Sequence, residues 1–151
     1  MKFSTRTLYG LKAVLVLAGR YGEGSLSVSQ IAKRENISIP YLEQILNALK
    51  KKGFVKSVRG PQGGYVLSKK PADTDLKDLF YALDEGKLPV VKPKEPVSAE
   101  SDEVTLANLL FWKKFENALE TGLSEMTLKD LIDESRRVKK GKPASSHTFN
   151  I

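Results

Sequence analysis

Residues 25–53 read SLSVSQIAKRENISIPYLEQILNALKKKG, and this stretch decides the fold. Ser27 and Gln30 have the spacing of a capping box, which predicts the start of a short helix. After a tight turn, Ser38 is a suitable cap for a second helix. One side of that second helix carries a continuous apolar stripe made of Leu42, Ile45, Leu46 and Leu49. Two helices joined in this way predict a helix-turn-helix whose second member is the recognition helix.

The residues that follow the recognition helix change from a helical to an extended pattern. β-Branched and aromatic residues occur in 54–58 and 65–67, and they flank the turn RGPQGG at 59–64. This pattern predicts a β-hairpin, and a hairpin placed directly after a recognition helix is a wing. We therefore expect a mainly α fold with a small β-hairpin, in which residues 1–84 form a winged helix-turn-helix domain.

Further helices are expected on both sides of this unit. The first begins at Ser4 or Thr5 and ends within 21–24, where two glycines interrupt the pattern. Its expected buried stripe consists of Leu8, Leu11, Val14, Leu15 and Ala18. Another helix follows the hairpin and ends at Gly86.

The second half of the chain is predicted to hold a connector, a long helix and a tail. Three prolines in residues 85–100 indicate an exposed connector. Residues 101–137 are expected to form a long helix, capped by Ser101 and ended by Gly122, followed by a short terminal helix. Residues 138–151 are expected to be a flexible tail.

The long helix carries more large apolar residues than a single small core can cover. We therefore expect part of its surface to meet a second copy of the chain in a homodimer. The expected dimerisation residues are Leu106, Leu109, Leu110, Trp112, Phe115 and Leu119. A ligand pocket lined by Trp112 and Phe115 is the alternative use of these aromatic side chains.

Charge is distributed unevenly along the 151 residues, whose formal net charge is +7. Residues 1–72 hold 13 lysines and arginines against 3 acidic residues, whereas residues 73–151 hold 12 against 15. A strongly basic half in a chain without an apolar run long enough to span a bilayer favours a polyanionic partner such as double-stranded DNA. A merely soluble basic surface is the alternative. With no signal-peptide pattern at its start, the chain is expected to be cytoplasmic.

Candidate DNA contacts fall in the recognition helix and the wing. Residues at the start of a recognition helix reach base edges, and hydroxyl, carboxylate and amide side chains suit that role. Arg59 in the wing turn is placed to enter the minor groove, although a solvated loop arginine is the alternative. Lysine and arginine elsewhere are candidates for phosphate contacts. The expected DNA-binding residues are Ser38, Tyr41, Glu43, Gln44, Arg59, Lys2, Arg6, Lys33, Lys56 and Gln62, and the lysine run at 50–52 adds further candidate phosphate contacts.

Four stretches together resemble one family of bacterial regulators. They are FSTRTLYGL at 3–11, ISIPYLEQI at 37–45, GFVKSVRGPQGGY at 53–65 and TLKDL at 127–131. The joint match is similar to the Rrf-two (BadM-type) family. The resemblance implies a homodimer on a pseudo-palindromic operator, with a long C-terminal helix that crosses to the partner and a wing arginine in the minor groove.

Cysteine content decides which branch of that family the chain resembles. Members that bind an iron–sulfur cluster carry three cysteines in the connector, whereas this sequence contains none. It is therefore similar to the cluster-free branch, which includes a cysteine-metabolism repressor and in which a partner protein or a small-molecule ligand can exert control. We expect no cofactor and no metal.

Other functional classes have less support. The single histidine, His147, cannot form a multi-histidine metal site, and no nucleophile and base are paired, so an enzyme is not expected. A protein-interaction adaptor stays open, because winged helices also bind proteins. The expected function is a sequence-specific transcription regulator that acts as a repressor by occluding a promoter.

Overall fold

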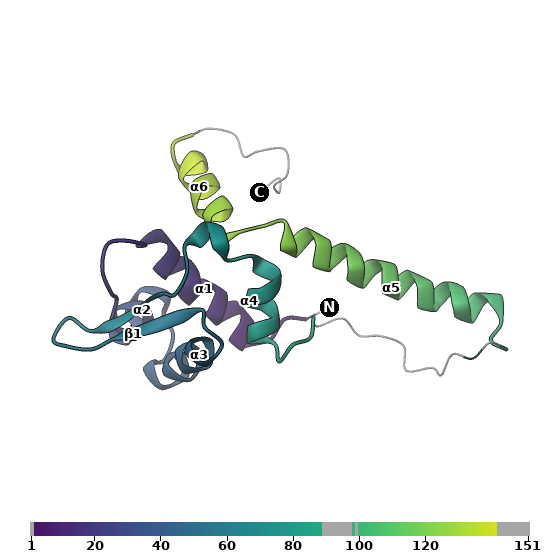
Figure 1. Ribbon diagram of the computed structural model, residues 1–151, viewed down its shortest axis with the longest axis horizontal. Coiled ribbons are helices and arrows are strands. Elements are labelled where there is room, and N and C mark those ends of the chain that lie inside the picture. The colour runs from purple at the N-terminus through teal and green to yellow at the C-terminus, as the bar shows by residue number, and fades with distance from the viewer. Residues whose placement is uncertain (1, 89–97, 99, 142–151) are drawn as a thin grey trace.

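Figure 1 shows the computed structural model, which describes residues 2–88, 98 and 100–141. In chain order the elements are α1 (Thr5–Gly19), α2 (Val28–Glu35), α3 (Ile39–Lys51), β1 (Val55–Val58), β2 (Gly64–Leu67), the 3-10 turn η1 (Pro71–Asp73), α4 (Leu76–Leu83), α5 (Glu103–Ser124) and α6 (Leu128–Lys139). Helices α1–α4 and the hairpin form one packed body, from which α5 extends as a long rod (Figure 1). The expected mainly α fold with one small hairpin is confirmed.

The helix-turn-helix forms as its capping residues predict. The Gln30 backbone N–H donates to Ser27 Oγ at 3.1 Å, and the Ser27 N–H donates to Gln30 Oε1 at 2.9 Å. Asn36 then ends α2 in the left-handed conformation, with φ of 54°. Asparagine tolerates this conformation better than most residues, which explains the sharp turn into α3.

Helix α3 lies against the centre of the core. Its stripe is almost completely enclosed, since Leu42, Ile45, Leu46 and Leu49 each expose 1% or less of their surface. At the C-terminal end Gly53 has φ of +82°, and the Phe54 N–H donates to the Leu49 carbonyl at 2.9 Å. The burial of one face leaves the opposite, polar face of α3 in solvent.

Helix α1 buries only part of the expected stripe. Val14 and Ala18 are buried as expected, whereas Leu8 is 52% exposed and Leu11 and Leu15 are only partly buried. The other enclosed positions of this helix include Gly10, Ala13 and Leu17. A Cβ on Gly10 would lie 2.3 Å from Leu83 Cδ2, so the absence of a side chain lets α1 and α4 approach closely.

The hairpin is tied to the helix-turn-helix through the main chain. Strands β1 and β2 are antiparallel, with Val55 opposite Leu67 and Val58 opposite Gly64. The Leu26 N–H donates to the Tyr65 carbonyl at 3.1 Å, and the Tyr65 N–H donates back to the Leu26 carbonyl at 2.7 Å. A Cβ on Gly64 would lie 2.1 Å from the Leu26 carbonyl oxygen. Glycine at this position therefore permits the bridge.

The long helix differs from the prediction at both ends. Asp102, rather than Ser101, is the N-cap, because its carboxylate accepts from the N–H groups of Val104 and Thr105 at 2.9 and 3.1 Å. Both residue types are suitable caps, so local sequence does not distinguish them. Helix α5 also continues through Gly122 to Ser124, which shows that one glycine near the end of a helix does not terminate it.

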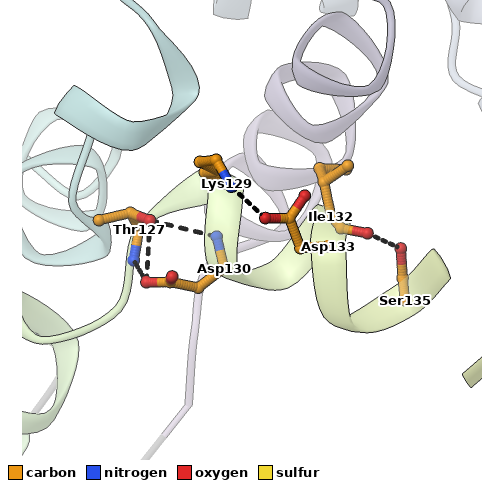
Figure 2. A network of polar contacts seen from close by, with 6 residues as sticks. All are labelled: Thr127, Lys129, Asp130, Ile132, Asp133 and Ser135. Atoms are coloured by element: carbon orange, nitrogen blue, oxygen red, sulfur yellow. Dashed lines mark hydrogen bonds and ion pairs between the residues drawn. The ribbon is translucent and has the colours of Figure 1, made fainter. Parts of the chain in front are cut away.

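Helix α6 is joined to the winged domain at its start. Thr127 and Asp130 form a capping box (Figure 2), with the Asp130 N–H donating to Thr127 Oγ1 at 3.2 Å. The Leu76 N–H donates to the Met126 carbonyl at 2.9 Å, and the Leu128 N–H donates to the Thr74 carbonyl at 3.0 Å. These bonds fix the starts of α4 and α6 side by side. The helix runs to Lys139, so it includes the first two residues of the expected tail.

Residues 89–97 and 99 of the connector and residues 142–151 of the tail, including His147, lie outside the described residues.

Candidate DNA-binding interface

The first turn of α3 presents polar side chains to solvent. Ser38, Glu43 and Gln44 are exposed, while Tyr41 is partly buried. The Ser38 side chain forms no capping hydrogen bond, so its hydroxyl remains available for a ligand. The Tyr41 ring packs edge-on against Tyr9, with centroids 5.8 Å apart, and this contact limits the movement of the phenol.

One residue of this surface was missed at the sequence level. Asn47 is exposed and follows Glu43 and Gln44 by four and three residues on α3. Residues at these spacings share a helix face, so Asn47 extends the same surface by one turn. Its carboxamide can pair with adenine in the manner expected of Gln44. Helical spacing was the available signal.

The wing turn holds Arg59 in solvent beside a constrained loop. Gly60 has φ of +119°, and its carbonyl accepts from the Gly63 N–H at 2.9 Å. The Gln62 carbonyl accepts from Ser25 Oγ at 2.6 Å. The backbone at Gln62 is thus attached to the loop that precedes α2, while its side chain is exposed.

The expected phosphate contacts divide into two kinds. Lys2, Lys33 and Lys56 are exposed. Arg6 is partly buried, and its Nε is enclosed without a hydrogen-bond partner among the described residues. Arg6 is therefore less suited to a phosphate contact than the three lysines.

Within the part of the chain that the structure describes, no ion pair neutralises the positive charge around α3 and the wing. The ion pairs within the described ranges join residues of α1, α2 and α6 and the turn after α1, such as Lys12 with Glu35 at 4.0 Å and Arg20 with Glu23 at 2.9 Å. None of them involves Arg59, Lys56 or the lysines at 50–52 at the end of α3. Unneutralised cations on two adjacent elements favour a polyanion.

A second surface lies on α5, which has no buried residue. Leu106, Leu109 and Leu110 are 36%, 38% and 53% exposed. Phe111, which the sequence reasoning did not include, is 56% exposed and stacks on Phe115 with centroids 6.0 Å apart. Trp112, Phe115 and Leu119 are partly buried. The face left exposed is apolar, as at the contact surfaces of subunits.

A side-chain hydrogen bond connects α5 to the winged domain, beside the packing of Leu119 and Leu123 against the core. The Tyr81 hydroxyl on α4 donates to Glu120 Oε1 on α5. This hydrogen bond to the carboxylate, with a smaller contribution from burial, raises the pKa of Tyr81 to about 12. Lys77 Nζ lies 5.9 Å from the centroid of the same ring.

No group of three or more histidine, cysteine or acidic residues capable of holding a metal ion is found within the described ranges. No helix among those residues is long and apolar enough to cross a membrane.

Comparisons with known proteins agree on one family. The family model Rrf2, described as an iron-dependent transcriptional regulator, matches residues 3–134. The HTH-type transcriptional regulator CymR of Bacillus subtilis is 39% identical over 131 residues, which cover 87% of this chain and 89% of that protein.

Solved structures show the same relationship. The chain superimposes on IscR of T. potens with a TM-score of 0.74 and 35% identity, covering 92% of this chain and 91% of the other. It superimposes on CymR, described as the global cysteine regulator of B. subtilis, with a TM-score of 0.74 and 34% identity, covering 88% and 97%.

Proposed function

The chain belongs to the Rrf2 family of helix-turn-helix transcriptional regulators, and on that premise we propose that it represses transcription by binding a pseudo-palindromic operator as a homodimer. The observation that carries this proposal is the pairing of two exposed polar elements. Helix α3 packs against α2 and β1, and a main-chain bridge between Leu26 and Tyr65 joins the segment before α2 to β2. The bound dimer blocks access to the promoter. It acts in the bacterial cytoplasm, where the DNA lies.

Each α3 helix is proposed to read bases in the major groove. Gln44 and Asn47 supply carboxamides, Glu43 supplies an acceptor, and Ser38 supplies a hydroxyl. Arg59 is proposed to enter the adjacent minor groove, while Gln62 lies beside it in the same turn. Lys2, Lys33 and Lys56 are proposed to contact phosphates, and Arg6 is assigned a supporting role because its Nε is enclosed.

The homodimer is proposed to form through α5. In one copy of the chain this helix exposes leucine and aromatic side chains, and covering them with a second copy removes apolar surface from water. A two-fold axis between the α5 helices would also arrange two recognition helices as a palindromic operator requires.

The regulator is proposed to act without an iron–sulfur cluster, although the family model refers to iron. Clusters of this type are held by cysteine thiolates, and the sequence has no cysteine. The residues present do not fit such a group. Its binding to DNA is instead proposed to be controlled by an effector protein or a small molecule.

The test begins with selection of random duplexes on the purified protein. The best duplex is then titrated against the wild type, Gln44→Ala and Arg59→Ala at two salt concentrations, with Lys139→Gln as a charged control outside the proposed interface. Recovery of a palindromic site whose affinity falls in the first two variants only would support the proposal. Affinity should fall steeply with salt, with a slope of about 0.9 per contacted phosphate. Failure to enrich any duplex would contradict it and favour the adaptor function.

A further inference from the structure

A cavity lies between the end of α1, η1 and α6, and its lining residues take no part in the proposed DNA interface. Its volume is about 310 Å³, and the lining includes Gly19 at the end of α1, Lys70 and Pro71 at η1, and Ile132 and Arg136 on α6. This volume is at the low end of the range of about 300–1,000 Å³ that small-molecule sites occupy.

The cavity has an apolar floor. Ala18 is buried, and Gly19, Pro71 and Ile132 are partly buried. A Cβ added to Gly19 would lie 3.8 Å from Ile132 Cδ1, at ordinary contact distance. A larger side chain at this glycine would therefore occupy the cavity without any backbone clash near the Cβ.

The rim of the cavity is cationic. Lys129, Asp133 and Arg136 lie at four- and three-residue spacing on the same side of α6. Lys129 and Asp133 form an ion pair, visible in Figure 2, and the hydrogen bond from Lys129 lowers the pKa of Asp133. Since that pair is neutral in sum, the positive charges of Lys70 and Arg136 determine the net charge of the lining.

Arg136 extends across the cavity from α6 toward α1. Its Nη2 donates to the Gly19 carbonyl at 3.5 Å, which is long for a hydrogen bond. A guanidinium has five N–H donors in a planar fork that matches a carboxylate. The Arg136 charge also attracts the Asp133 carboxylate, but within the described ranges the contact with Gly19 is the hydrogen bond that the guanidinium forms. Further N–H donors of the fork are therefore available to a ligand.

From this combination we propose that the cavity binds a small organic acid, with its carboxylate on Arg136 and Lys70 and its apolar body against Ile132 and Gly19. Inorganic anions are disfavoured, because they have no hydrocarbon to cover the apolar floor. Neutral apolar molecules are disfavoured, because they leave the two cations without a partner.

The site is connected to the wing on one side and to α4 and α5 on the other. Lys70 and Pro71 follow β2 of the wing by three residues or more. Helix α6 is held to the start of α4 by the two main-chain bonds at Thr74 and Leu76. Ligand in the cavity would thus contact both the segment leaving the wing and the helix that follows α5. An effect on operator affinity rests on the proposed function, whereas binding itself does not.

Binding is tested by ¹H–¹⁵N chemical-shift titration of the full chain with sodium benzoate and sodium 3-phenylpropionate, beside benzamide and 3-phenylpropionamide as neutral counterparts. We expect saturable shifts concentrated at Gly19, Ala72 and Ile132, and affinity at least about tenfold weaker for the amides, as loss of a charge-assisted bond predicts. Arg136→Gln should weaken the acids about tenfold as well.

Arg137→Gln is the matched control, because it removes the same charge from the next residue of α6, which does not line the cavity. Gly19→Leu is the second variant and should abolish binding by filling the cavity, with unchanged circular dichroism as the check on folding. Equal shifts with acid and amide, or equal loss in Arg136→Gln and Arg137→Gln, would overturn the site. If the acids bind but no duplex is ever selected, the site stands and the proposed function fails.

Discussion

Helices α3 and α5 both carry leucine-rich stripes, yet the two stripes meet opposite environments. The α3 stripe is 1% exposed or less at each of its four residues, whereas α5 has no buried residue and its Leu110 is 53% exposed. The first stripe is covered by α1, α2, α4 and β1 of the same chain. An apolar stripe therefore predicts that a helix face is covered, but it does not predict whether the covering surface belongs to the same chain.

The largest effect is expected from breaking the α3 stripe. Leu46→Ala removes a fully enclosed side chain from the core and should lower the free energy of unfolding by about 2–5 kcal/mol. Urea denaturation measures this change, with the exposed Asn47→Ala as the control on the same helix. A decrease in the free energy of unfolding below about 1 kcal/mol would mean that neighbouring side chains move to fill the cavity left at Leu46.

The corresponding change on α5 should affect association rather than folding. Phe111→Asp places a carboxylate on the proposed dimer face and should weaken self-association by about 2 kcal/mol or more, roughly 30-fold. Sedimentation at several concentrations measures the dissociation constant, and the exposed Lys114→Ala is the control. An unchanged constant would show that this part of α5 is not the contact.

The polar side of α3 is also exposed, and its proposed contact is DNA rather than a second copy of the chain. Gln44→Ala should cost about 1–3 kcal/mol against the selected duplex and relax preference at one base position. Lys50→Gln should instead weaken all duplexes alike and reduce the salt slope by about 0.9. Fluorescence anisotropy with matched and mismatched duplexes separates these outcomes. Identical behaviour of the two variants would remove Gln44 from base readout.

The smallest effect is expected at the hydrogen bond between Tyr81 on α4 and Glu120 on α5. The hydrogen bond to Glu120 raises the pKa of Tyr81 from 10.0 to about 12. A raised pKa in the folded state means that the stabilisation is complete below pH 10 and is lost as the pH rises toward 12. Tyr81→Phe should therefore flatten the stability profile between pH 10 and 12, as measured by urea denaturation at each pH. If the stability of Tyr81→Phe falls with pH as that of the wild type does, groups other than Tyr81 cause the decline.

Local motifs were the most predictable part of the fold. The capping box at Ser27 needs only residues three apart, and it forms as expected. The buried face of α1 was not predictable in the same way, because this helix is apolar on several sides. Its orientation depends on Leu83 packing against Gly10, a contact between residues far apart in the sequence.

The residue types of the candidate site could be predicted from the sequence, whereas the exposure of each polar group to a ligand was less predictable. Position at the start of the recognition helix identified Ser38, Glu43 and Gln44 but not Asn47, and turn composition identified the wing. Enclosure of Arg6 Nε and attachment of the Gln62 carbonyl to Ser25 depend on tertiary packing. No pattern of neighbouring residues encodes either feature.

The bridge between Leu26 and Tyr65 also has a consequence for how operators in this group of proteins diverge. It consists of two main-chain hydrogen bonds that join β2 to the segment before α2, so this attachment of the wing does not depend on the side chains of Leu26 and Tyr65. Under the proposed function, substitutions on α3 would alter which bases are preferred while the wing kept its place beside the helix-turn-helix. Proteins that share this bridge would then differ in the bases they contact and not in the spacing between the two contacted segments of DNA.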